Sequence, residues 1–195
     1  MRIVGGRHKG RRLLGPEGRR LRPTSDRARE ALFNLLAHGP YGSDAGPMPA
    51  GVDVLDVFAG SGALGLEALS RGASHVGFFE NDPNAIDLIR RNAAGMADPA
   101  EITFQRSDAT RPGPAPRAHG LVLMDPPYGS GLAVPALAAL AEHGWLTGDA
   151  VVAIELARDE PFEAPAGFEA IDQRHYGAAR LVLLRRLTAG SVHTD

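Results

Sequence analysis

Short apolar runs alternate with longer amphipathic stretches along most of the chain. The apolar runs are brief enough to be buried strands, and they occupy residues 52–58, 75–79, 101–105, 120–124 and 149–155. The stretches between them have helix-forming composition and apolar residues at helical spacing, at residues 63–69, 83–94 and 133–143. Residues 168–176 and 180–187 predict a final hairpin around Gly177. Alternating strands and helices predict an α/β doubly wound sheet, largely parallel, with one antiparallel strand from that hairpin.

The first 38 residues follow a different pattern. Residues 2–4 and 11–14, joined by a turn at 5–10, predict a small basic hairpin. Thr24 or Ser25 can cap a helix that runs to about residue 38. Its apolar stripe is predicted to consist of Ala28, Leu32, Leu35 and Leu36. Three arginines are expected to stay outside, near the mouth of a site: Arg22, Arg27 and Arg29.

Glycine and proline mark the boundaries between the parts of the chain. Residues 39–51 are rich in both, which predicts a linker between a basic extension (1–38) and a catalytic body (52–187). The tail, 188–195, is expected to be disordered.

One stretch, residues 53–65, combines a strand, a glycine turn and a helix. Gly60, Gly62 and Gly65 have G-x-G-x-x-G spacing, and Glu80 follows about twenty residues later at the end of the next strand. Gly60 and Gly62 would allow a tight turn and close approach to a ligand, whereas Gly65 would allow the helix to pack against the strand. The alternative is a glycine turn that serves packing alone.

Carboxylates stand at the ends of several predicted strands. They are Asp56, Glu80, Asp108 and Asp125. Ligands of doubly wound sheets bind at the carboxyl ends of the strands, where the strand order reverses, so these side chains are expected to converge on one crevice. Each of them, taken singly, is also typical of a helix cap or a turn.

Composition narrows the chemistry. At 195 residues the chain is one domain with at most a small appendage, and it has no cysteine, which excludes disulfides, thiolate metal sites and cysteine nucleophiles. Its histidines lack ligand spacing, so no metal site is expected. No apolar run is long enough to span a membrane and the N-terminus lacks a signal-peptide pattern, which favours a cytoplasmic protein.

Charge is distributed unevenly. Residues 1–29 carry ten basic and two acidic side chains, a net charge of +8, which leaves −10 on the rest of a chain whose net charge is −2. A basic arm on an acidic body indicates a polyanion partner such as nucleic acid. A solvated basic tail in an arginine-rich proteome would give the same count.

Two motifs together carry a resemblance to a known family. Asp125-Pro126-Pro127-Tyr128 follows one strand and Asp56-Val57-Phe58-Ala59-Gly60-Ser61-Gly62 follows another, as in S-adenosylmethionine-dependent amino-methyltransferases. Residues 58–72, with Arg22-Pro23-Thr24 and Ile3-Val4-Gly5-Gly6, make the chain similar to the bacterial 16S rRNA guanine-N2 methyltransferase family from residue 2 to about 186. The resemblance implies a Rossmann-like class I methyltransferase with a seven-stranded sheet.

The resemblance also implies residue roles. The catalytic turn would be Asp125, Pro126, Pro127 and Tyr128. S-adenosylmethionine would be bound by Asp56, Phe58, Ala59, Gly60, Ser61 and Gly62 on the methionine side, by Glu80 and Asn81 at the ribose, and by Asp108 and Ala109 at the adenine. RNA would be bound by Arg2, Arg7, Lys9, Arg11, Arg12, Arg22 and Arg27. The implied partner is 16S rRNA or a small-subunit assembly particle, and the protein is expected to be a monomer.

Three other functions agree with part of the same pattern. A nicotinamide-dependent oxidoreductase would use the glycine motif and Glu80, but a carboxylate at Asp56 suits a pyrophosphate poorly because like charges repel. Methylation of adenine in DNA or another nucleic acid would use the same Asp-Pro-Pro-Tyr turn, although such enzymes usually carry a separate target-reading domain. An RNA-binding adaptor that keeps only the fold is the non-enzymatic alternative.

Overall fold

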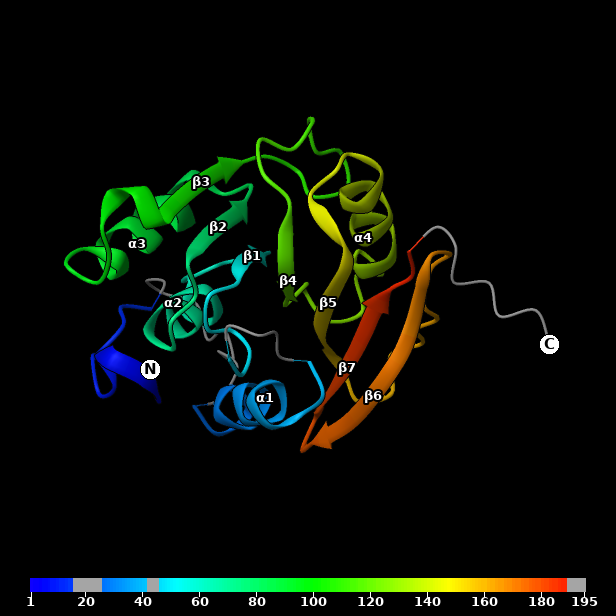
Figure 1. The fold of residues 1–195 in the computed structure, drawn as a ribbon, viewed down its shortest axis with the longest axis horizontal. Helices are drawn as coiled ribbons and strands as arrows, with labels where there is room; N and C mark the ends of the chain where they lie inside the picture. Colours follow the sequence, from blue (N-terminus) through cyan, green and yellow to red (C-terminus); the bar gives the residue numbers. More distant parts are fainter. Residues whose placement is uncertain (16–25, 42–45, 189–195) are drawn as a thin grey trace.

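The chain folds as one twisted seven-stranded sheet with helices on both faces, in a computed structural model that describes residues 1–15, 26–41 and 46–188 (Figure 1). The strands are β1 (Asp53–Val57), β2 (His75–Glu80), β3 (Ile102–Arg106), β4 (His119–Met124), β5 (Leu146–Ala157), β6 (Phe168–Tyr176) and β7 (Ala179–Arg186). The α-helices are α1 (Asp26–His38), α2 (Ala63–Ser70), α3 (Pro83–Ala93) and α4 (Ala133–Glu142), with 3₁₀ turns η1 (Gly6–His8) and η2 (Pro99–Glu101).

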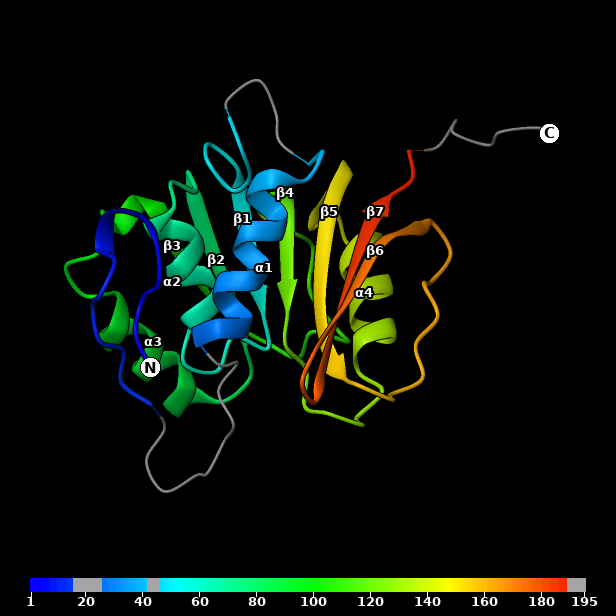
Figure 2. The same ribbon diagram turned by 90° about the horizontal axis from the view of Figure 1, so that it is seen from below.

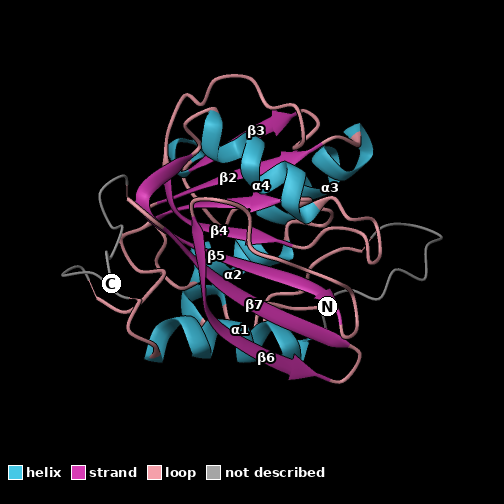
Figure 3. Ribbon diagram, turned by 90° about the vertical axis from the view of Figure 1, so that its right-hand side faces the viewer, coloured by secondary structure: helices cyan, strands magenta, loops and turns pink. Residues whose placement is uncertain are grey.

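The strand order is β3-β2-β1-β4-β5-β7-β6, and β7 runs antiparallel to the other six strands (Figure 3). The predicted doubly wound sheet with its antiparallel terminal hairpin is confirmed. The order reverses between β1 and β4, which places the ligand crevice of such a sheet at the ends of these two strands.

Each face of the sheet has its own hydrophobic core. Apolar side chains of α1, α2 and α3 pack on one face with alternate residues of β1, β2, β4 and β5. The intervening residues of the same strands pack on the opposite face with α4. Figure 2 shows α1 on the near side of the sheet and α4 on the far side. We call these two surfaces the α1 face and the α4 face.

The first residues of the chain form a narrow hairpin. Ile3 N donates to Arg11 O at 2.9 Å and Leu13 N donates to Met1 O at 3.1 Å, while η1 occupies the connection. Ile3 and Leu13 are buried in the core of the α1 face, so the hairpin is fastened to the body by apolar packing. The predicted tail beyond Thr188 and the proposed caps at residues 24 and 25 lie outside the described residues.

Helix α1 corrects one expectation from the sequence. Arg29 does not stay outside: its exposed fraction is 0%, and its guanidinium lies 2.9 Å from Asp26 Oδ1 and 3.5 Å from Glu67 Oε2. Arg29 is on the buried side because it falls between Ala28 and Leu32 on the apolar stripe, and Glu67 of α2 neutralises its charge there. Phe33 is buried on this stripe as well, whereas Leu35 is only partly buried.

Glu67 joins three segments that are far apart in sequence. Its Oε2 accepts from Val4 N at 2.8 Å, its Oε1 accepts from Arg71 Nε at 2.8 Å, and both oxygens lie in a fully buried side chain. One carboxylate therefore connects the hairpin, α1 and α2, which all pack on the α1 face.

Candidate active site

Carboxylates lie on the α1 face at the carboxyl ends of three neighbouring strands. Side chains alternate between faces along each strand, and Val54, Phe78 and Leu123 belong to the core of the α1 face. Two residues further on, Asp56, Glu80 and Asp125 therefore project from the same face at the ends of β1, β2 and β4.

The three carboxylates are close enough for their charges to affect the pKa of Asp56. Burial raises the pKa of this carboxyl well above its ordinary value, and the charges of Asp125 and Glu80 raise it further, against the Gly65 N–H that lowers it. The structure thus brings three of the predicted strand-end carboxylates together.

The glycine turn leaves β1 through backbone that favours glycine. Gly60 has φ +55° and Gly62 has φ +76°, as the spacing predicts, but Phe58 also has φ +60°. A bulky residue in the left-handed region is strained, and here two hydrogen bonds to Phe79 O, from Phe58 N at 3.0 Å and Ala59 N at 3.3 Å, hold the turn.

The three glycines have different surroundings. A Cβ at Gly65 would lie 2.5 Å from Phe78 Cε1 and one at Gly62 would lie 2.8 Å from Ile89 Cγ2, so both serve close packing of helices on the sheet. A Cβ at Gly60 would meet nothing closer than Phe58 O at 3.9 Å. Gly60 is therefore the glycine whose bare backbone borders open space.

Asp56 supports this turn from below. Its exposed fraction is 1%, and Oδ2 accepts from Gly65 N at 2.8 Å. Gly65 is the third residue of α2, where the N–H has no partner within the helix. The carboxylate thus fixes the start of α2 against β1.

Glu80 joins the glycine turn to the loop after β2. Its Oε2 accepts from Gly60 N at 2.8 Å, and its Oε1 accepts from Asn81 N at 2.8 Å and Asp82 N at 3.0 Å. The carboxylate lies beside the open side of Gly60 and is part-buried. Asn81 is exposed next to it.

Asp108 stands further out, after the edge strand β3. It is exposed, and its Oδ1 accepts from Thr110 N at 2.9 Å and Thr110 Oγ1 at 2.8 Å. These hydrogen bonds lower the pKa of Asp108, so the carboxylate stays ionised. Ala109 is buried in the core of the α4 face.

The Asp-Pro-Pro-Tyr turn begins where β4 leaves β1. Asp125 N donates to Val57 O at 3.3 Å, which extends the pairing of the two strands by one residue. Pro126 is buried and Pro127 is exposed, while the Tyr128 side chain is 47% exposed. The start of the motif is therefore fixed in the sheet, and its aromatic end is half-exposed.

Sequence reasoning missed one residue of this region, Glu155. It lies near the end of β5 with an exposed fraction of 6%, and its Oε1 accepts from Tyr128 Oη at 2.7 Å. The available signal was the lone charge in the apolar run from Ala150 to Leu156, which a buried strand does not need for packing.

The basic residues predicted to bind RNA divide into engaged and unpaired groups. Arg7 pairs with Glu101 at 3.2 Å, Arg2 lies 3.6 Å from Asp26, and Arg11 donates to the carbonyls of Ala94 and Gly95. Within the described part of the chain, three have no ion pair: Lys9, Arg12 and Arg27. Arg22 lies outside the described residues.

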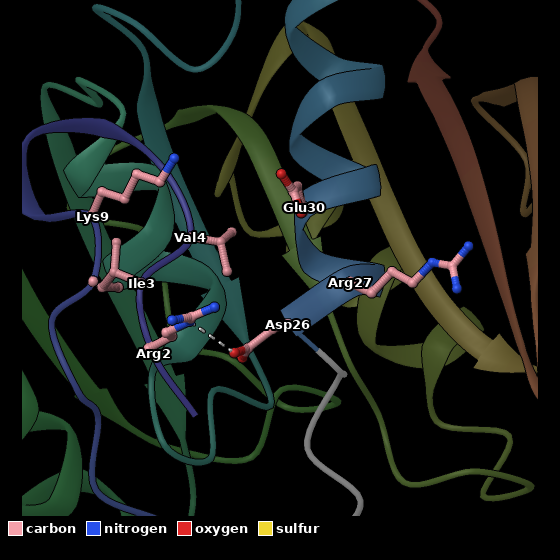
Figure 4. A pocket seen from close by; sticks show the side chains of 8 residues that line it. Arg2, Ile3, Val4, Lys9, Asp26, Arg27 and Glu30 are labelled. Atoms are coloured by element: carbon pink, nitrogen blue, oxygen red, sulfur yellow. Dashed lines mark ion pairs between the residues drawn. The ribbon is translucent and has the colours of Figure 1, made fainter.

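A pocket of about 310 Å³ separates the hairpin from the start of α1. Figure 4 shows Arg2 and Lys9 on the hairpin side and Asp26 and Glu30 on the helix side, with Arg27 pointing away from the hairpin. Acidic and basic side chains both line it, so it is not a purely cationic cavity.

Asn92 of α3 links the N-terminal segment to the glycine turn. Its Nδ2 donates to Leu14 O at 3.1 Å and to Ser61 O at 2.9 Å, while its Oδ1 accepts from Leu14 N at 2.7 Å. The side chain of Asn92 is buried, so these hydrogen bonds are shielded from water.

Residues 1–15, 26–41 and 46–188 offer neither a metal centre nor a membrane-spanning helix. These residues contain no group of three or more His, Cys, Asp or Glu side chains able to hold a metal ion. None of their helices is long and apolar enough to cross a membrane.

Known proteins resemble this chain over almost its whole length. Residues 1–185 match the family model described as "Conserved hypothetical protein 95". Ribosomal RNA small subunit methyltransferase D of Haemophilus influenzae is 36% identical over 91% of this chain and 89% of its own. The putative rRNA methyltransferase YlbH of Bacillus subtilis is also 36% identical, over 82% of this chain and 84% of its own.

Solved structures agree with this result. The putative methyltransferase yhhF from Escherichia coli superposes with a TM-score of 0.79 at 31% identity, covering 96% of this chain and 98% of its own. A putative RNA methyltransferase from Pyrococcus horikoshii, at 19% identity and a TM-score of 0.66, shares the fold. The chain belongs to the family of the ribosomal RNA small subunit methyltransferases D.

Proposed function

We propose that this enzyme transfers a methyl group from S-adenosylmethionine to the N2 amine of a guanine in small-subunit ribosomal RNA. The observation that carries the proposal is the position of Asp125-Pro126-Pro127-Tyr128, which leaves β4 beside the glycine turn of β1, at the reversal of strand order. An amine held by this turn would lie next to a ligand held by the glycine turn. The family's ribosomal RNA methyltransferases supply the substrate class.

The residues around the glycine turn fit the cofactor. Gly60 borders open space, and the carboxylate of Glu80 next to it can accept hydrogen bonds from ribose hydroxyls. The ionised Asp108 would accept from the adenine amine. Because Asp56 is buried beneath the turn, we assign to it the support of the methionine side through Gly65 rather than a salt bridge with the ligand.

The target amine is a poor nucleophile because its lone pair is delocalised into the base. The Asp125 carboxylate and the Pro126 carbonyl would accept hydrogen bonds from this amine and turn its lone pair toward the cofactor. S-adenosylmethionine, when bound, supplies an electrophilic methyl group. Asp125 would also take the proton that the amine loses, and the half-exposed Tyr128 would offer a face for stacking an extruded base.

We assign RNA phosphate contacts to the unpaired basic residues of the extension, Lys9, Arg12 and Arg27. Phosphate contacts position the RNA and carry no sequence information. Arg2 and Arg7 are exposed and remain candidates, since surface ion pairs contribute little and exchange readily. The partner is ribosomal RNA, either free or in an assembly particle, and the active unit is a monomer.

The test uses purified protein, radiolabelled S-adenosylmethionine and two substrates, small-subunit ribosomal RNA and the corresponding protein-bound particle. Digestion to nucleosides and mass spectrometry should identify N2-methylguanosine. The better substrate of the two shows whether the enzyme acts on free RNA. Methyladenosine, or label recovered in DNA or protein, would contradict the assigned substrate.

Replacement of Asp125 by alanine should lower methyl transfer by about 100-fold or more, because the amine loses its acceptor. Cofactor binding, measured by calorimetry, should stay near the wild-type value. Asp159→Ala removes an exposed carboxylate after β5 and is the control for the charge change. Full activity of Asp125→Ala would show that the turn does not hold the amine.

A further inference from the structure

One buried acceptor next to the Asp-Pro-Pro-Tyr turn has no assigned role. Glu155 is 6% exposed, and among the residues that the structure describes its Oε2 has no hydrogen-bond partner. A buried carboxylate oxygen without a donor is destabilising. A side chain that served only to orient Tyr128 would need one acceptor, which Oε1 already provides.

Glu155 stands beside Asp125 in the sheet. β4 and β5 are parallel neighbours, with Leu123 opposite Ala153 and Met124 opposite Ile154. The next pair in this register is Asp125 and Glu155, and both project from the α1 face because Leu123 and Ala153 belong to its core. Adjacent strands are about 4.8 Å apart, so two carboxylates stand side by side at the place assigned to the target base.

Tyr128 fixes how a base would meet the second carboxylate. The phenolic oxygen lies at the edge of the aromatic ring and reaches Glu155 Oε1 at 2.7 Å. A base stacked on the face of this ring would present its own edge toward the same carboxylate. The edge that carries the amine is directed there by Asp125.

Among the bases with an exocyclic amine, only guanine has a ring N–H next to that amine. In adenine the ring nitrogen beside the amine, N1, carries a lone pair, and in cytosine N3 does the same. A carboxylate at this position accepts a hydrogen bond from guanine N1–H, whereas it repels the lone pair of adenine or cytosine.

We propose that Glu155 is a specificity-determining residue, which selects guanine by accepting a hydrogen bond from its N1–H while Asp125 holds N2. This proposal rests on the proposed function, since it concerns a base whose amine is methylated. It gives a structural reason for the choice of guanine that lies in this chain's own residues.

The test compares two small-subunit RNAs that differ at one nucleotide. The nucleoside analysis described above is first extended to locate the guanosine that the wild-type enzyme methylates. One RNA keeps this guanosine, and the other carries 2-aminopurine riboside in its place, which keeps the amine but replaces N1–H by a lone pair. Wild type should prefer guanosine in kcat/KM by about 10- to 100-fold, the range expected for loss of a hydrogen bond to a charged group.

Two variants separate direct reading from positioning. In Glu155→Gln the amide oxygen can still accept from Tyr128 while its NH₂ group faces the base, so the preference for guanosine should fall by about tenfold or more. Tyr128→Phe removes the hydroxyl alone and should leave the preference unchanged. Cofactor binding by both variants, measured by calorimetry, reports correct folding.

Each outcome has one meaning. If wild type forms N2-methylguanosine but methylates both RNAs equally, Glu155 does not read N1–H, whether or not the variants fold. If Glu155→Gln keeps the wild-type preference, Glu155 does not select the base. If Tyr128→Phe loses the preference as fully as Glu155→Gln does, Glu155 acts only by holding Tyr128. If wild type forms no N2-methylguanosine at all, the proposed function itself is wrong.

Discussion

Four carboxylates stand at the ends of adjacent strands, and the donors around each determine its use. Asp56 is buried and bonded to Gly65, and Glu80 accepts three backbone N–H groups. Asp125 opens the Asp-Pro-Pro-Tyr turn, and Glu155 keeps one oxygen without a described partner. Residues of like charge thus divide into two that hold the glycine turn and two to which we assign contacts with the base.

Glu80 permits a test of this division. Glu80→Gln keeps one oxygen acceptor but places an NH₂ group against the Gly60 N–H or the loop after β2, so the turn loses its shape. We expect cofactor affinity to fall by about 10- to 100-fold, as for loss of hydrogen bonds to a charged group, with RNA affinity unchanged. Calorimetry with S-adenosylmethionine measures the first quantity and filter binding the second.

Glu163→Gln, an exposed position after β5, is the matched control for the change of charge. Wild-type cofactor affinity in Glu80→Gln would remove Glu80 from the cofactor site.

Buried charges were the residues that the sequence predicted least well. Arg29 and Glu155 both occupy positions where pattern alone predicts either solvent or an apolar side chain. Their burial depends on partners far away in the chain, Glu67 for Arg29 and Tyr128 for Glu155. Hydrophobic periodicity describes one element at a time, so it contains no information about such pairs.

The two neighbouring arginines of the N-terminal hairpin have different surroundings. Arg11 donates to the last carbonyls around the end of α3, whereas the neighbouring Arg12 has no ion pair among the described residues. Alternation along the strand separates the two side chains. The same element therefore uses one arginine to hold the protein together and leaves the other for the RNA contact that we propose.

This contrast predicts different results for two substitutions with the same charge change. Arg12→Ala should weaken RNA binding and reduce the slope of log affinity against log salt by about 0.7, the value for one phosphate contact on a single strand. Arg11→Ala should leave the slope unchanged and lower stability, because α3 loses a donor at its C-terminal end.

RNA binding measured between about 50 and 200 mM salt distinguishes the two. Equal slopes for Arg12→Ala and wild type would place Arg12 away from the phosphates.

Regular elements were predicted well where local signals agree. Glycines with positive φ end or begin the predicted turns, and the start of α3 follows from Pro83 after Asp82, whose carboxylate accepts from Asn84 N at 2.9 Å. β5 is longer than predicted because it begins at Leu146, before the apolar run itself. Pairing of Leu146 with His119 of β4 extends the strand at its start, and pairing of Ala157 with Ala179 of β7 extends it at its end.

At the scale of the whole molecule, the amino ends of β2 and β4, opposite the candidate active site, contain two buried histidines. His75 and His119 have ring centroids 6.0 Å apart, and His119 Nδ1 donates to Trp145 O at 3.1 Å. Burial lowers the pKa of His119 to about 4 and lowers that of His75 as well, with Arg117 adding to both shifts and Asp53 opposing them.

Stability should therefore decline on acidification. Between about pH 6.5 and about pH 4 the unfolded chain binds a proton at residue 119 that the folded chain does not. The free energy of unfolding therefore decreases as the pH is lowered through this range, by up to about 3 kcal/mol. His119→Asn keeps an N–H for Trp145 O but does not titrate, and it should flatten this dependence in urea denaturation.

His143→Asn is the control, since His143 is exposed and its Nδ1 also bonds to a carbonyl, that of Ala139. An unchanged pH profile in His119→Asn would assign the acid sensitivity to other groups.

The hairpin and α1 also determine whether the catalytic body can be excised. Ile3, Leu13 and Phe33 cover the same core as α2, Glu67 would lose Arg29 and Val4 N as partners, and Asn92 would lose Leu14. Removing residues 1–38 would leave an apolar surface and unpaired buried polar groups beside the glycine turn. The N-terminal extension is thus not an exchangeable module, and transplanting a foreign RNA-binding segment in its place would require rebuilding the packing around Glu67 and Asn92 as well.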